Sequence, residues 1–126
     1  MKRIYVAGIL LLIAIGLCVA EYVSVRNCTD EYTNRIDKIE LMVESDNMKK
    51  AAFAARETEK NWEETINIID MLLFHDYVDD IGRNLAKLES YIEKEELAEF
   101  FATCEEAKEQ LRSLEESELP VARNVI

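Results

Sequence analysis

The stretch "IYVAGILLLIAIGLCVA", residues 4–20, decides how this chain is organised, because its 17 residues carry no charge. As a helix this run spans about 26 Å, slightly less than the roughly 30 Å hydrocarbon core of a bilayer. Extending the helix through Val25 closes that gap. We therefore predict that residues 4–25 cross a membrane and that residues 1–26 form a signal-anchor segment.

The residues at the two ends of the run indicate its orientation. Tyr5 and Tyr22 occupy positions where aromatic side chains anchor a helix at the membrane interface. Lys2 and Arg3 precede the run, and basic residues favour the cytoplasmic side of a membrane. We expect a single-pass protein with a cytoplasmic N-terminus and an extracytoplasmic domain formed by residues 27–126.

Two further interpretations of the N-terminal segment stay open. The small residues of "CVA", 18–20, precede Glu21, so a signal peptidase could cleave near Ala20 and release the domain. Gly16 and Ala20 are four residues apart, a small-xxx-small spacing that supports helix dimerisation in membranes. A homo-oligomer is therefore possible.

The domain of residues 27–126 is acidic, with 25 acidic and 12 basic residues and a net charge of −13. Such a charge repels phosphate backbones, so we expect no nucleic acid partner. Solubility is the simplest explanation of the charge, with loose cation binding or a basic partner as the alternative.

Cys28 and Cys104 are the two cysteines outside the membrane run. An extracytoplasmic compartment permits a disulfide between them, although two isolated cysteines do not form a framework. Their separation excludes a C-x-x-C redox or zinc motif. Whether they pair is left open.

The domain contains few of the residues that typically form turns, since it has one glycine, Gly82, and one proline. We predict an all-α fold, in which the anchor helix is followed by an antiparallel bundle of three or four helices. The first bundle helix is expected to begin within residues 27–30. Turns are expected at residues 44–47, with Ser45 or Asp46 capping the next helix, and at residues 93–96.

Nine apolar residues follow one another in steps of three or four, so one helix can hold all of them on a single face. Additional apolar residues make residues 66–78 the expected centre of the bundle. A coiled coil is the nearest rival, and Asp76 could instead cap a second helix, so whether residues 46–94 form one helix or two stays open. The nine residues are Trp62, Ile66, Ile69, Leu73, Tyr77, Ile81, Leu85, Leu88 and Ile92.

The last helix has an apolar line that Lys108 interrupts, so we expect its alkyl stem to pack while its ammonium reaches water. Pro120 is expected to stop the helix and leave residues 121–126 as a tail. The predicted line consists of Leu97, Phe101, Cys104, Leu111 and Leu114, with Phe100 and Ala107 beside it.

The chain's single histidine lies in "HDYVDD", residues 75–80. His75 and Asp79 are four residues apart and share a helical face, which supplies too few ligands for zinc. No nucleophile motif or phosphate loop accompanies them. We expect no metal, cofactor or catalytic residue here, and we interpret His75, Asp76, Tyr77 and Asp79 as structural or interaction residues.

The apolar anchor after "MKR", Trp62, "HDYVDDIGRNLAKLESYI" at 75–92 and "SELPVARNVI" at 117–126 give the chain a recognisable pattern. In these features it resembles domain-of-unknown-function family 4363, a family of short membrane-anchored bacterial proteins. The resemblance implies a bacterial cell-membrane setting and supplies no catalytic residues. It marks Trp62, His75 and Asp76 as positions of the family pattern.

These observations favour a non-enzymatic, membrane-tethered helical module that binds a protein partner, expected to be a membrane protein, at the outer face. Trp62, Tyr77 and the terminal "NVI", 124–126, are candidates for that surface, although core packing is the favoured role of Trp62 and Tyr77. The alternative is an extracytoplasmic bundle that senses a small ligand or pH and signals through a partner.

Overall fold

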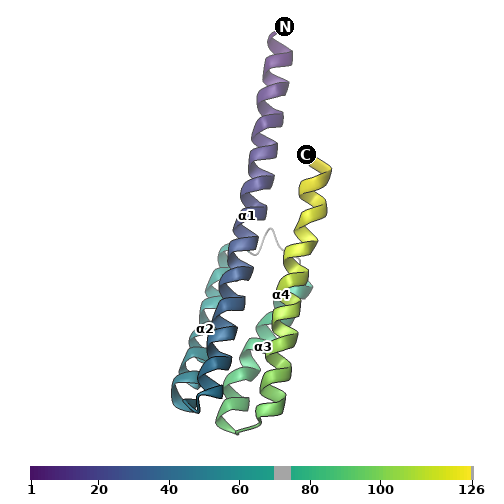
Figure 1. Cartoon of the computed structure of the whole chain (residues 1–126). Coiled ribbons are helices and arrows are strands. Elements are labelled where there is room, and N and C mark those ends of the chain that lie inside the picture. The colour runs from purple at the N-terminus through teal and green to yellow at the C-terminus, as the bar shows by residue number, and fades with distance from the viewer. Residues whose placement is uncertain (70–74, 126) are drawn as a thin grey trace.

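The structure, a computed structural model, describes the backbone of residues 1–69 and 75–125 and the side chains of residues 1–67 and 77–117. This part of the chain forms four helices: α1 (Lys2–Glu44), α2 (Met48–Ile69), α3 (His75–Glu93) and α4 (Leu97–Val125). Neighbours pack in the order α1–α2–α3–α4, and α4 also packs on α1, which closes the ring (Figure 1). The predicted all-α fold, a long apolar helix leading into a helical bundle, is confirmed.

Helix α1 is continuous from its apolar half into the bundle, so the expectation of a new helix start within residues 27–30 was wrong. Nothing in the sequence interrupts the helix, because no glycine or proline occurs between Leu17 and Glu44. Thr29, which could have acted as a cap, bonds instead to the carbonyl of Arg26 at 3.0 Å within the helix. The anchor and the bundle are therefore joined without a linker.

The turns predicted at residues 44–47 and 93–96 are both present, and they share one design. In each, the second residue after the helix has a left-handed backbone: Asp46 at φ 58° and Glu95 at φ 57°. The Asn47 N–H donates to the Met42 carbonyl at 2.9 Å, as in the Schellman ending of a helix. Asp46 thus ends α1 rather than capping α2, so the predicted cap was wrong.

The apolar stripe from Trp62 to Ile92 is divided between two antiparallel helices. Trp62 of α2 contacts Val78 of α3, and Arg56 pairs with Glu89, so residue numbers rise along one helix as they fall along the other. The question left open by the sequence, one helix or two, is thus answered by two helices, and the coiled-coil rival is excluded. Asp76 lies in the first turn of α3, while the connection at residues 70–74 lies outside the described residues.

Helix α4 continues through Pro120 to Val125, so the prediction that proline ends this helix was also wrong. A proline inside a helix removes one backbone hydrogen bond but leaves the following residues free to remain helical. The segment of residues 121–125 is therefore part of a 29-residue helix rather than a tail.

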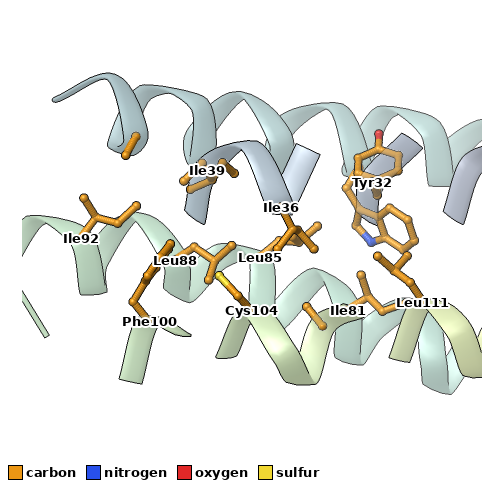
Figure 2. Packing of buried hydrophobic residues seen from close by; sticks show 14 of the residues in the cluster. Tyr32, Ile36, Ile39, Ile81, Leu85, Leu88, Ile92, Phe100, Cys104 and Leu111 are labelled. Carbon is orange, nitrogen blue, oxygen red and sulfur yellow. The ribbon is translucent and has the colours of Figure 1, made fainter. Parts of the chain in front are cut away.

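The core is built by apolar side chains from all four helices (Figure 2). Of the predicted stripe, the members from Ile81 to Ile92 are fully buried, whereas Ile66 is half-buried and Tyr77 is 39% exposed. On α4 the buried line passes through Phe100 rather than Phe101. The largest fully buried side chains are Trp62, Tyr32, Phe100, Ile36, Ile39, Ile81, Leu85, Leu88, Ile92, Leu111 and Leu114.

Replacing Glu95 with glycine should stabilise the protein by about 0.5–1 kcal/mol, because glycine adopts positive φ without the steric cost that a side chain incurs. Denaturant unfolding of the detergent-solubilised chain, followed by circular dichroism, measures the change. Lys94→Gly in the same turn is the matched control and should not stabilise, since Lys94 has no positive φ. Equal or lower stability of the Glu95→Gly variant would contradict the structure of this turn.

Candidate functional site

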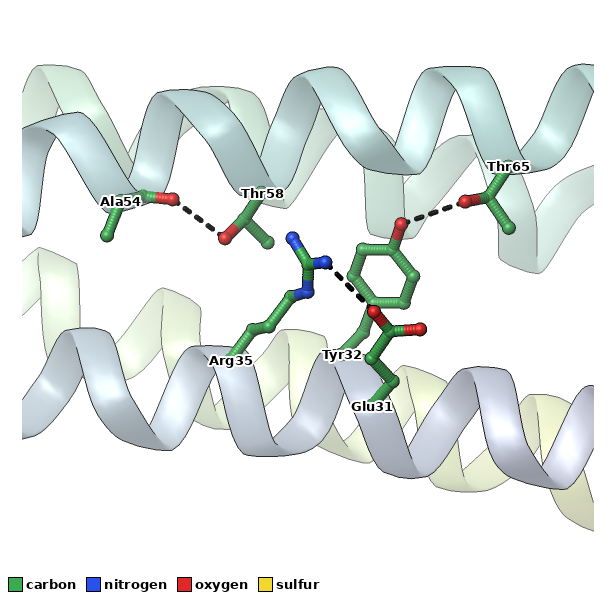
Figure 3. A network of polar contacts seen from close by, with 6 residues as sticks. All are labelled: Glu31, Tyr32, Arg35, Ala54, Thr58 and Thr65. Atoms are coloured by element: carbon green, nitrogen blue, oxygen red, sulfur yellow. Dashed lines mark hydrogen bonds and ion pairs between the residues drawn. The ribbon is translucent and has the colours of Figure 1, made fainter.

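Trp62 lies at the centre of the bundle, not on its surface, with 1% of its area exposed. Its indole N–H donates to the Val78 carbonyl at 3.3 Å, and its ring meets that of Tyr32 edge to face, with centroids 4.9 Å apart. The Tyr32 hydroxyl lies 3.0 Å from the Thr65 hydroxyl (Figure 3). Burial raises the pKa of Tyr32, although the hydrogen bond to Thr65 opposes this. Trp62 therefore joins α1, α2 and α3, and it is unavailable to a partner.

The predicted cluster in residues 75–79 is only partly described. Tyr77 and Asp79 are exposed on α3, while the side chains of His75 and Asp76 lie outside the described residues. Asp79 borders a hollow of about 330 Å³ between α2 and α3. The described walls of this hollow contain no histidine, cysteine or hydroxyl group, and their ionisable groups are the carboxylates of Glu63 and Asp79. The walls are formed by Trp62, Glu63, Ile66, Asn67, Val78, Asp79 and Gly82.

Among the described residues, no three His, Cys, Asp or Glu side chains are placed to hold a metal ion. That the protein uses no metal and catalyses no reaction stays a prediction.

Cys28 and Cys104 are both free thiols, and the geometry of α1 and α4 rules out a disulfide between them in the folded chain. Lys108 of α4 contacts Glu40 of α1, and Cys104 is one turn from Lys108, so Cys104 lies close to the level of Glu40. Cys28 lies about 18 Å from that level, measured along the axis of α1. A disulfide needs Cα atoms within about 7 Å. Burial, with a smaller contribution from Glu31, raises the pKa of Cys28 to about 11, and burial also raises the pKa of Cys104.

Lys108 is the centre of a charged cluster between α1 and α4. Its ammonium lies 3.0 Å from Asp37, 2.8 Å from Glu40 and 2.9 Å from Glu105. Only 21% of the Lys108 side chain is exposed, so its alkyl stem packs as expected, while its ammonium lies among carboxylates of which Asp37 and Glu105 are exposed. Burial disfavours its charge, but the close contacts with Glu40, Glu105 and Asp37 outweigh burial and raise the pKa of Lys108.

Glu40 depends on Lys108 more than the other two carboxylates do. Its side chain is 15% exposed, and its Oε1 atom is inaccessible to solvent. That atom makes no hydrogen bond of standard geometry, so the Lys108 ammonium at 2.8 Å supplies its compensating charge. Removing the ammonium would leave a nearly buried carboxylate without a counter-charge.

Two more polar contacts fix how α4 sits against its neighbours. The buried Asn84 amide of α3 donates to Gln110 Oε1 at 2.8 Å, and the buried Thr29 hydroxyl of α1 lies 3.3 Å from Glu115 Oε2. A one-turn slip of α4 would separate both pairs. These contacts specify the register of the bundle.

The α1–α4 surface also carries a polar hollow of about 430 Å³. Acidic groups outnumber the two basic ones, Lys108 and Arg112, and Lys108 is already bound by carboxylates. The lining residues are Thr29, Asp30, Thr33, Asp37, Glu105, Lys108, Glu109, Arg112 and Glu115.

A third hollow, of about 400 Å³, lies where α2 begins and α3 ends. Beside it Phe53 is 61% exposed, although it belongs to the bundle and not to the apolar half of α1. Sequence reasoning missed this position, because an isolated phenylalanine among alanines also fits a core residue. The lining residues are Met48, Lys49, Ala52, Phe53, Arg56, Ile92, Glu93 and Glu95.

Comparison with known proteins gives one family. A family model described as Domain of unknown function (DUF4363) matches residues 19–125. The chain belongs to this family. No curated protein and no solved structure gives a significant match to the chain.

The extent of the DUF4363 match coincides with the bundle described here. It begins within the apolar part of α1 and ends at Val125, the last residue of α4. The resemblance seen in the sequence is thereby confirmed, and the final turns of α4 are part of the family domain.

Replacing Lys108 with methionine should destabilise the DUF4363 domain by about 1–3 kcal/mol, because Glu40 would be left without its counter-charge. Denaturant unfolding of the full chain in detergent measures this loss. Adding Glu40→Gln should recover part of it, since the uncompensated charge is then gone.

The matched control is Arg112→Met, also on α4, whose guanidinium pairs with Glu109 and is 64% exposed. An exposed pair contributes little, so this variant should stay within about 0.5 kcal/mol of the native chain. If Lys108→Met is equally harmless, the dependence of Glu40 on Lys108 is refuted.

Proposed function

We propose that the protein is a non-enzymatic, membrane-tethered helical module that binds a protein partner, itself a membrane protein, on the outer side of a bacterial cell membrane. The observation that carries the proposal is the form of α1, whose apolar half projects from the bundle while its second half belongs to the core. Leu10, Leu11 and Leu12 on that half are 59–70% exposed. Exposed apolar surface of this extent is favourable in lipid and unfavourable in water.

The apolar half of α1 passes the length and composition criteria of a membrane span. We propose a single pass with a cytoplasmic N-terminus, supported by Lys2 and Arg3 at that end of the helix. Cleavage near Ala20 is the alternative; it would leave the part of α1 that contributes to the core, but no anchor.

The surface that best fits a protein partner is the hollow beside Phe53, at the end of the bundle far from the apolar half of α1 (Figure 1). Its apolar walls are bordered by Lys49 and Arg56 on one helix and by Glu93 and Glu95 near the turn. An apolar centre with a mixed charged rim is typical of protein–protein contacts. The occupant we propose is a protein segment that inserts an apolar side chain beside Phe53.

Sensing of a small ligand is the second candidate function. It is favoured by the hollow of about 330 Å³ next to Trp62, because Trp62 contacts α1 through Tyr32. A ligand there would act on the helix that leads to the membrane.

A photo-crosslinking amino acid at position 53 of the full-length protein, in its native membrane, tests the partner hypothesis. We expect one membrane protein to be crosslinked reproducibly, and we expect Phe53→Ser to lower its co-purification about tenfold or more. The matched control is Leu41, which is 60% exposed on α1. A crosslinker or a serine at position 41 should give neither effect.

No crosslinked partner, or one recovered equally from position 41, would contradict the proposed surface. That result would favour the hypothesis that the protein senses a small ligand. The mass of the protein recovered from whole cells and from the medium separately shows whether cleavage near Ala20 occurs.

A further inference from the structure

The contacts between α1 and α4 set which residues of the two helices lie at the same height. The helices are antiparallel, since Lys108 meets Glu40 while Glu115 meets Thr29. Both helices rise about 1.5 Å per residue. We take the contact between Thr29 and Glu115 as the reference and move the same number of residues along each helix. Leu119 then lies level with Val25, and Arg123 lies level with Glu21, to within about one turn.

Only α4, among the described helices, accompanies α1 towards the membrane. The contact of Tyr32 with Thr65 places the end of α2, Ile69, near the height of Cys28. Helix α3 begins three residues before Val78, which contacts Trp62, so it starts no closer to the membrane. Figure 1 shows α4 extending beside α1 past the ends of both.

The burial pattern of α1 agrees with this arrangement. Ile15, Cys18 and Tyr22 are half-buried, whereas Leu17 on the other side of the helix is 66% exposed. The three residues are spaced by three and four and continue the buried line that begins at Val25. One face of the apolar half is therefore less exposed than the other, and α4 is the described helix that extends towards it.

Both helices change their charge at the same height. On α1, residues 4–25 contain a single charge, that of Glu21, and Arg26 is the first charged residue of the bundle half. On α4, Glu118 is the last acidic residue, and residues 119–126 contain a single charge, that of Arg123. Since Leu119 lies level with Val25, the two changes define one plane across the axis of the bundle.

We infer that this plane is the outer surface of the membrane and that the last turn of α4, residues 121–125, is a second membrane contact, on phospholipid headgroups. The inference rests on the membrane tether proposed above. A hydrocarbon core of roughly 30 Å that begins at Ile4 ends near residue 24 of α1. The last turn of α4 then lies within about 7 Å of that boundary, the depth of interfacial helices.

The composition of this turn suits that depth. Two valines and an alanine favour the acyl boundary, and Arg123 is a cation that can bind a lipid phosphate. The rest of the domain is strongly acidic and would be repelled by lipid phosphates, so contact with the membrane is expected only at this end.

The test places an environment-sensitive fluorophore at single cysteines of the full chain in phosphatidylcholine–phosphatidylglycerol vesicles. The native cysteines are replaced by alanine, and circular dichroism checks folding. The labelled positions are 12 in the apolar half of α1, 125 at the end of α4, and 109, an exposed position in the middle of α4. Quenching by nitroxide-labelled lipids is compared with quenching by aqueous iodide.

We expect lipid nitroxides to quench labels 12 and 125, and iodide to quench label 109. If label 12 is in lipid and label 125 is quenched like label 109, the second contact is refuted while the tether stands. If label 12 is quenched by iodide, the tether fails, and the second contact fails with it.

The role of Arg123 is tested in the same vesicles. Arg123→Glu should reduce lipid quenching of label 125 by at least half, since it replaces attraction to phosphate by repulsion. Arg112→Glu makes the same charge change farther down α4 and should leave label 125 unaffected. Unchanged quenching in the Arg123→Glu chain would refute the contact with phosphate.

Discussion

The uninterrupted backbone hydrogen bonding of α1, from Lys2 to Glu44, is the constraint on which the rest of the structure depends. One helix supplies both the apolar segment and a side of the bundle core, through Val25, Tyr32, Ile36, Ile39 and Val43. Because no flexible linker separates the two parts, the orientation of the bundle follows that of the apolar helix. The other three helices are thereby placed relative to the apolar half of α1.

Helix α4 is tied to α1 by polar and charged groups as well as by the shared apolar core. The Lys108 cluster and the contact of Thr29 with Glu115 are spaced along the interface, so they fix the register as well as the pairing. Partly buried charge pairs are an inefficient source of stability, because desolvation offsets much of their attraction. These contacts instead fix the register of α4 against α1. The register determines how far α4 extends beside the apolar half of α1. That extension underlies the proposed second contact with the membrane.

The sequence was sufficient for the features that depend on local composition. The uncharged run of residues 4–20 predicted the long apolar helix, and the charged stretches at 44–47 and 93–96 predicted the turns. The failures occurred where local signals are ambiguous. Asn27 and Asp30 favour a helix start, but they are tolerated inside a helix that packing continues. Pro120 disfavours a helix without forbidding it.

The division of the Trp62–Ile92 stripe could not be read from spacing, because steps of three and four fit one helix or two. Trp62 was favoured as a core residue, and the core is where the structure places it. Lys108 was recognised as an interruption of an apolar line, but two of its three partners come from α1, about 70 residues away in sequence. Phe53 gave no signal, since exposure depends on which faces of α2 the other helices cover.

The most direct test of the account is nuclear magnetic resonance of the isotope-labelled full chain in lipid nanodiscs, measuring backbone chemical shifts and amide exchange across residues 15–35. The account predicts helical shifts without interruption and slow exchange through Glu21, Arg26 and Asp30. Non-helical shifts or fast exchange over several consecutive residues in this region would show a hinge between anchor and bundle. That result would contradict the continuity of α1 and the fixed height of α4 derived from it.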